Sequence, residues 1–147
     1  MVRTLLEDGF PRHMIHACHN RTAEVSARRG EVANHLKPVV HKYDLRNTHL
    51  NEGERWTRYR PKGKMLVLNR LFPEGIRIPK ALIGENIVHL PTMKTHVFTT
   101  ITGAMKNAFG GLLSERRHWT HEVIHETLVD LLRIQKDIHP CILAVMD

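Results

Sequence analysis

The residues best suited to chemistry lie in one stretch that is rich in lysine, histidine, amide and hydroxyl side chains. It contains Lys94 and His96 and, further along, Lys106 and Asn107. No Asp or Glu occurs from residue 86 to residue 114. Cationic, amide and hydroxyl groups gathered without compensating acids bind anions and stabilise negative charge that develops in a reaction. The stretch therefore predicts a binding site for a small anionic ligand.

The elements that flank this stretch would bring its side chains together. The apolar run 86–90 predicts a strand, and residues 99–109 predict a helix. A strand that leads through a polar loop to a helix start is where α/β proteins bind anions, because the first N–H groups of a helix have no intrahelical partner. Lys94 and His96 alternate, so in an extended segment they point to the same side.

Each polar residue of the stretch then receives a role. Lys94 and Lys106 would supply charge, and Thr99 with free backbone N–H groups would donate hydrogen bonds. His96 would orient the ligand or carry a proton. The structural alternative is that Lys106 and Asn107 cap loops and that His96 bonds a carbonyl group. An enzyme and a binding protein are both compatible with this pattern.

A wider set of residues in the same region forms a recognisable signature. The set comprises Pro91, Lys94, His96, Thr102, Gly103, Ala104, Lys106, Asn107, Phe109, Gly110 and His118. It resembles the signature of the family called domain of unknown function 362, most strongly over residues 78–147. The resemblance places His118 in the site as well, so that His96 and His118 become the candidate general acid or base. The alternative for His118 is a solvated side chain at a helix start.

The resemblance also carries an implication about redox chemistry. Members of that family often carry ferredoxin-type iron–sulfur modules, which implies a redox system with an iron–sulfur partner. The two cysteines, Cys18 and Cys141, are too few to hold a four-cysteine cluster. We therefore expect no iron–sulfur cofactor on this chain and place any cluster on a partner protein or on a missing segment, while a divalent metal ion stays an open alternative.

A second motif offers a different chemistry. His121-Glu122-Val-Ile-His125 spells His-Glu-x-x-His, in which two histidines on one helix face bind zinc and the Glu acts as general base. The histidines here continue an apolar face, and no third ligand follows at a known spacing. A metal-dependent hydrolase using His121 and His125 is therefore the alternative function. Cys18 also lies among His13, His16 and His19, as in some metal sites.

The overall composition points to one globular domain over residues 1–147. A chain with 41% hydrophobic and 25% charged residues is typical of soluble proteins, and no apolar run is long enough to span a bilayer. We expect a cytoplasmic protein. The net charge of +7 leaves a nucleic-acid-binding module as a further alternative, but 5% aromatic residues are few for base stacking.

The predicted fold is α/β, a mostly parallel sheet with helices on its faces. The expected helices lie at 22–36, about 79–84, 99–109 and 118–136, and the expected strands at 14–18, 38–43, 86–90 and 141–145. Because the chain ends directly after the last strand, we expect it to be part of a longer protein. Open strand edges would then favour self-association.

Overall fold

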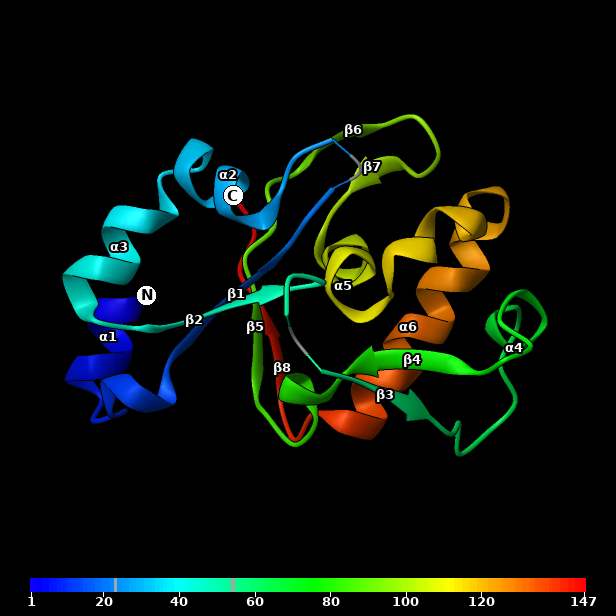
Figure 1. Ribbon diagram of the computed structural model, residues 1–147, viewed down its shortest axis with the longest axis horizontal. Coiled ribbons are helices and arrows are strands. Elements are labelled where there is room, and N and C mark those ends of the chain that lie inside the picture. Colours follow the sequence, from blue (N-terminus) through cyan, green and yellow to red (C-terminus); the bar gives the residue numbers. More distant parts are fainter. Residues whose placement is uncertain (23, 54) are drawn as a thin grey trace. The chain divides into compact units, whose positions relative to one another are not determined.

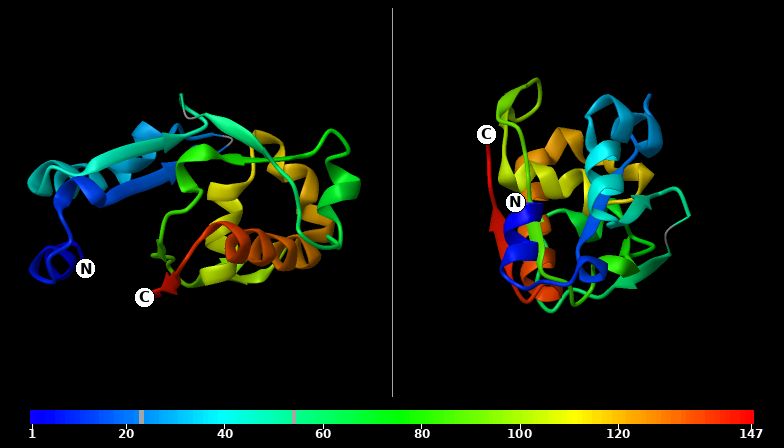
Figure 2. Two further views of the ribbon diagram at one scale, coloured as in Figure 1. Left: turned by 90° about the horizontal axis from the view of Figure 1, so that it is seen from below. Right: turned by 90° about the vertical axis from the view of Figure 1, so that its left-hand side faces the viewer.

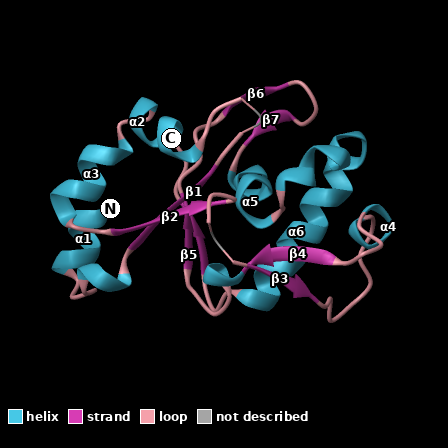
Figure 3. Cartoon of the chain, in the orientation of Figure 1, coloured by secondary structure: helices cyan, strands magenta, loops and turns pink. Residues whose placement is uncertain are grey.

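A computed structural model describes residues 1–22, 24–53 and 55–147, and at position 115 it describes the backbone alone. The chain divides between residues 54 and 55 into two compact units. Each unit contains both helices and strands (Figures 1 and 3). The single-domain organisation stays a prediction, and the two units are described one at a time.

The first unit is built on a pair of parallel strands. Its elements are α1 (Val2–Glu7), the 3₁₀ helix η1 (Arg12–Met14), β1 (His16–Asn20), α2 (Ala27–Ala33), α3 (Leu36–Tyr43) and β2 (Arg46–Leu50). β1 and β2 run side by side (Figure 2) and pair in register from His16 opposite Arg46 to Asn20 opposite Leu50. Parallel strands need a long crossover connection, and α2 and α3 form it.

The strand predicted at 38–43 is wrong, because these residues belong to α3. The pair Val39-Val40 favours a strand, and Pro38 was expected to begin it. In the structure Pro38 is the third residue of the helix, where the backbone N–H has no intrahelical partner, so its absence costs nothing. Val40 is buried, and this burial favours the helix.

The second unit contains three strand pairs and the two longest α-helices of the described chain. Its elements are β3 (Trp56–Tyr59), α4 (Leu68–Leu71), β4 (Ile76–Pro79), η2 (Lys80–Leu82), β5 (Ile87–His89), β6 (Lys94–His96), β7 (Thr100–Thr102), α5 (Ala104–Leu112), η3 (Glu115–Val123), α6 (Ile124–Ile138) and β8 (Ile142–Ala144). β5 pairs with β8 in parallel, whereas β3 with β4 and β6 with β7 are antiparallel.

The prediction of a mostly parallel sheet therefore needs correction. The fold does mix helices with strands, but the described strands form two-stranded sheets, of which two are parallel and two antiparallel. The main reason lies at residues 97–99, where a short turn reverses the chain between β6 and β7. A chain that turns back at once pairs antiparallel, since a parallel pair needs a long crossover.

The core of the second unit lies between α5, α6 and β4. Ile124, Leu131, Ile134 and Ile138 are buried at helical spacing on α6, which explains why this helix was predictable. Asp130, which is completely buried on the same helix, accepts hydrogen bonds from the backbone N–H groups of residues 66, 67 and 68 at 2.8, 2.9 and 3.0 Å. A single carboxyl group thus anchors the segment that leads into α4.

None of the helices within the described ranges combines the length and the apolar character that a membrane crossing requires.

Candidate anion-binding site

The β6–β7 hairpin positions the first two predicted site residues. Lys94 pairs with Thr102, and His96 pairs with Thr100. The hydroxyl group of Thr102 is buried and lies 3.2 Å from the carbonyl oxygens of both Thr92 and Lys94. α5 begins two residues after Thr102, so the strand that carries Lys94 lies beside the start of that helix. The helix predicted from residue 99 is thus shortened by a strand, which the β-branched run 100–102 favours.

Thr99 shapes the turn between the two strands. Its hydroxyl group donates a hydrogen bond of 2.8 Å to the carbonyl oxygen of Ile101, and the N–H of Ile101 donates one of 2.6 Å to the carbonyl oxygen of Thr99. Between them Thr100 takes a positive φ of 62°, which is unusual for a β-branched residue. Because Thr99 is buried and its hydroxyl proton is used in the turn, it positions the hairpin.

A row of rings connects the hairpin to α5 and η3. The ring of Phe98 lies 5.9 Å from that of His96 and 4.6 Å from that of His121, between ring centres. The ring of Phe109 of α5 lies 5.3 Å from that of His121. The Lys106 ammonium sits 4.3 Å from the centre of the Phe109 ring, a cation–π contact. His96, His121 and Lys106 are thus gathered around two phenylalanine rings.

Positive charges dominate this region. Burial lowers the pKa of Lys106, and the neighbouring Arg117 and Lys94 lower it further. Burial also lowers the pKa of His96, followed in effect by Lys106, His121 and Lys94. Within the described residues no carboxyl group opposes either shift. We call the set Lys94, His96, Lys106, Arg117 and His121 the cationic cluster. A bound anion would relieve its mutual repulsion.

Hydrogen bonds fix the neutral forms of the two histidines in the cluster. The N–H of Phe98 donates to Nδ1 of His96 at 3.2 Å, so the proton of a neutral His96 sits on Nε2. Nδ1 of His121 lies 2.9 Å from the carbonyl oxygen of His118, which can only accept, so Nε2 of a neutral His121 is without a proton. The cluster therefore contains one imidazole that donates through Nε2 and one that accepts there.

Asn107 does not share the surroundings of its neighbour Lys106, because its side chain points to the buried His89. Its side-chain amide lies 3.1 Å from Nδ1 of His89, and Nε2 of His89 lies 2.5 Å from the side-chain oxygen of Gln135. His89 and Gln135 are both buried. Asn107 therefore connects α5 to β5 and α6, and this contact holds the helix that carries Lys106.

His118 contributes its backbone carbonyl oxygen to His121, while its own side chain is exposed and lies edge-on to Trp119 at 6.3 Å. The structure brings Lys94, His96 and Lys106 together and adds Arg117 and His121. In the sequence His121 stood out only within the His-Glu-x-x-His motif, and Arg117 had no assigned role. The packing of η3 near α5 and the hairpin places both residues at this site.

The His-Glu-x-x-His motif crosses the boundary between two helices. His121 lies in the last turn of the 3₁₀ helix η3, and His125 lies in the first turn of α6. Val123 breaks the α-helical conformation between them, with φ −127° and ψ 41°. Glu122 and His125 are exposed, whereas His121 is half-buried between two phenylalanine rings. The regular helix that sets the spacing in this motif is therefore interrupted.

A hollow of about 410 Å³ in the same unit is lined by Arg58, Tyr59 and Phe72, among others, and by no member of the cationic cluster. The cluster and the hollow are separate features of this unit.

Comparison with known proteins gives one match. A family model described as "Domain of unknown function (DUF362)" matches residues 1–147, well beyond the residues 78–147 in which the signature is most evident. No curated protein and no solved structure matches the chain. The chain belongs to the DUF362 family.

Proposed function

We propose that this protein binds a small anionic ligand, of the phosphate or carboxylate class, at the cationic cluster. The observation that carries the proposal is that Lys94 and Lys106 both lie close enough to His96 to lower its pKa, and that Lys94 and Arg117 also lower the pKa of Lys106. Positive charges that lie this close repel one another. An anion between them would be stabilised by each.

The two histidines of the cluster add hydrogen-bonding specificity. Nε2 of a neutral His96 donates, and Nε2 of a neutral His121 accepts. A ligand with both an anionic oxygen and a hydroxyl group would satisfy the two together. The same pair would allow proton transfer to a bound ligand, which keeps His96 as the candidate acid or base. The catalytic role of His118 stays a prediction from the family signature.

Binding to a panel of simple anions tests this proposal. We would titrate the untagged chain with inorganic phosphate, sulfate, malate and a nucleoside monophosphate by calorimetry at low salt. The Lys94→Met and Lys106→Met variants should bind the best anion at least about tenfold more weakly, because each removes about 1.4 kcal/mol or more of charge stabilisation. Lys80→Met, an exposed lysine on η2, is the matched control.

The control variant should bind like the parent. Equal affinity of the parent and both cluster variants for an anion that binds the parent would contradict the proposal, provided that circular dichroism shows all of them folded. Equal weakening by Lys80→Met would point to net charge instead of a site, and this result would also count against it.

An iron–sulfur partner stays an expectation from the family resemblance. Both cysteines are exposed and lie in different units of the chain.

A further inference from the structure

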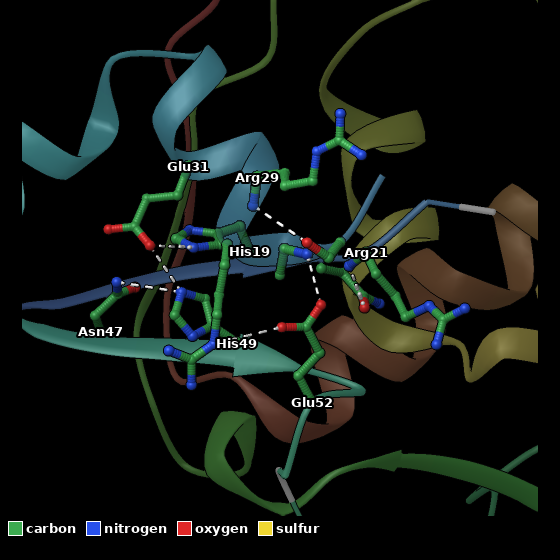
Figure 4. Close-up of polar contacts among 11 residues, drawn as sticks. His19, Arg21, Arg29, Glu31, Asn47, His49 and Glu52 are labelled. Atoms are coloured by element: carbon green, nitrogen blue, oxygen red, sulfur yellow. Dashed lines mark hydrogen bonds and ion pairs between the residues drawn. The ribbon is translucent and has the colours of Figure 1, made fainter. Parts of the chain in front are cut away.

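The first unit brings two histidines together through its parallel strands. His19 of β1 is the register partner of His49 of β2. Residues directly opposite each other in a sheet project from the same face. The two rings lie 4.8 Å apart between their centres, tilted by 54° (Figure 4). Two imidazoles that are 30 positions apart in the sequence thus become neighbours.

A carboxyl group from the crossover helix completes the group. Glu31 of α2 points at both rings (Figure 4), and its Oε2 lies 2.8 Å from Nε2 of His49 and 3.7 Å from Nε2 of His19. All three side chains are largely buried: that of His49 is 14% exposed, that of His19 is 16% exposed and that of Glu31 is 8% exposed. The carboxyl group and both Nε2 atoms therefore face one small, largely buried space.

Hydrogen bonding among these three side chains leaves one ring nitrogen, Nε2 of His19, without a hydrogen-bond partner in the described chain. The contact between Glu31 and His49 satisfies those two residues, but Nε2 of His19 is shut off from solvent and has no hydrogen-bond partner within the described chain. A buried polar atom without a partner is costly, and native proteins rarely leave one. Nε2 of His19 faces the same carboxylate oxygen, so a cation between them would satisfy it.

The spacing of the three atoms suits a metal ion. The candidate ligand atoms all lie within 4.8 Å of one another. Metal–ligand bonds of about 2.0–2.2 Å in a tetrahedral arrangement place ligand atoms about 3.4 Å apart. The two distances to Glu31, 2.8 and 3.7 Å, fall on either side of that value. Small side-chain rotations would bring all three into coordination.

From this geometry we propose that His19, Glu31 and His49 bind a divalent transition-metal ion, with Zn²⁺ or Fe²⁺ as the best matches. Two imidazole nitrogens and one carboxylate oxygen suit these ions, whereas Mg²⁺ and Ca²⁺ prefer all-oxygen sites. Three protein ligands leave coordination positions open for water or a small ligand. Asn47 lies next to this space, with its side-chain nitrogen 3.3 Å from Nε2 of His49.

Binding of Co²⁺, a spectroscopic substitute for Zn²⁺, tests the site. The untagged full chain, stripped with a chelator, should bind one equivalent of Co²⁺ with visible absorption bands that Zn²⁺ abolishes. His19→Ala, His49→Ala and Glu31→Gln should each weaken this binding at least about tenfold. His16→Ala, an exposed histidine on the same strand β1, is the matched control and should leave it unchanged.

A second measurement needs no variant and so remains valid if the variants unfold. On the parent chain, nitrogen-15 NMR should show that one equivalent of Zn²⁺ shifts the Nε2 resonances of His19 and His49 before those of the other ten histidines. Zn²⁺ that shifts only other histidines, Co²⁺ binding that survives in all three variants, or loss of binding in His16→Ala alone would each overturn the proposal.

Discussion

The backbone N–H of Phe98 donates a hydrogen bond of 3.2 Å to Nδ1 of His96. A protonated imidazole has no acceptor nitrogen, so protonation of His96 would break this bond. Burial is the main cause that opposes this protonation, and the neighbouring Lys106, His121 and Lys94 oppose it as well. His96 therefore combines a fixed neutral form with a strongly positive surrounding.

This arrangement predicts how the pKa of His96 responds to charge removal. Burial, Lys106, His121 and Lys94 hold this pKa below the ordinary value, so Lys106→Met should raise it toward that value. An NMR titration of the His96 ring would measure the change. Lys80→Met removes the same charge from the same unit and should leave this pKa unchanged. A pKa of His96 that does not move in Lys106→Met would show that the lysine does not act on the ring.

The bound anion should have the opposite effect on His96. Negative charge favours the imidazolium, so an anion raises the pKa of His96. By linkage, anion affinity should increase as the pH falls through the pKa of His96. Calorimetry at pH 7.5 and pH 5.5 measures this change. Affinity that decreases at the lower pH, for an anion whose own charge stays constant, would contradict it.

Because Asn107 contacts the buried His89, replacing Asn107 should mainly reduce stability, whereas replacing Lys106 should mainly reduce anion affinity. Asn107→Ala leaves Nδ1 of buried His89 without its donor, which should lower the free energy of unfolding by about 1–2 kcal/mol. Urea denaturation measures this loss. The effect of Asn107→Ala on anion affinity should be smaller than the effect of Lys106→Met. The opposite order of effects would make Asn107 a ligand-binding residue.

Replacing Asp130, which lies outside the cationic cluster, should strongly reduce the stability of the protein. Asp130→Ala removes the acceptor of three backbone N–H groups, two of them in buried surroundings, and should cost about 3–5 kcal/mol. Both tryptophans, Trp56 and Trp119, lie in the second unit, so their fluorescence follows its unfolding in urea. Glu126→Ala, an exposed acidic residue on the same helix, should change stability by less than about 0.5 kcal/mol. Equal losses in the two variants would contradict the anchoring role.

The burial of His139 should make the stability of the protein depend on pH. Burial lowers its pKa, and its Nδ1 donates a hydrogen bond of 2.8 Å to the carbonyl oxygen of Glu85. Below about pH 6.5 the unfolded chain therefore binds a proton that the folded chain does not, so stability falls as the pH drops. In His139→Asn, whose amide can still donate to Glu85, the loss between pH 7.5 and 5.5 should be smaller. An equal loss in parent and variant would assign the effect to other groups.

The sequence was informative where a local pattern coincides with the contacts that stabilise an element. The apolar run at 86–90 contains β5, and residues 141–145 contain β8, because both runs are rich in the aliphatic residues that strands favour, although Val88 and Leu143 are exposed. Ile124 and Leu131 belong to the apolar spacing that predicted a helix over residues 118–136. The structure forms α6 over Ile124–Ile138, whereas Glu115–Val123 form the 3₁₀ helix η3. Lys94, His96 and Lys106 were predictable as a group because the acid-free stretch that contains them is continuous.

Long-range pairing is what the sequence did not reveal. His19 belongs to a local cluster of histidines around Cys18, but its partners Glu31 and His49 are supplied by a crossover helix and by a parallel strand. No spacing along the chain encodes that register. The α3 helix was missed because Val39-Val40 resembles a strand locally, and the burial that decides between the two states is a tertiary effect.

The most direct test of the anion site is a crystal structure of the full chain grown with selenate or tungstate, dianions that anomalous scattering locates without ambiguity. The proposed function predicts an anomalous peak within hydrogen-bonding distance of Lys94 and Lys106, on the side to which His96 presents Nε2. Well-ordered side chains of the cationic cluster with no peak between them, and dianions bound only elsewhere on the chain, would contradict it.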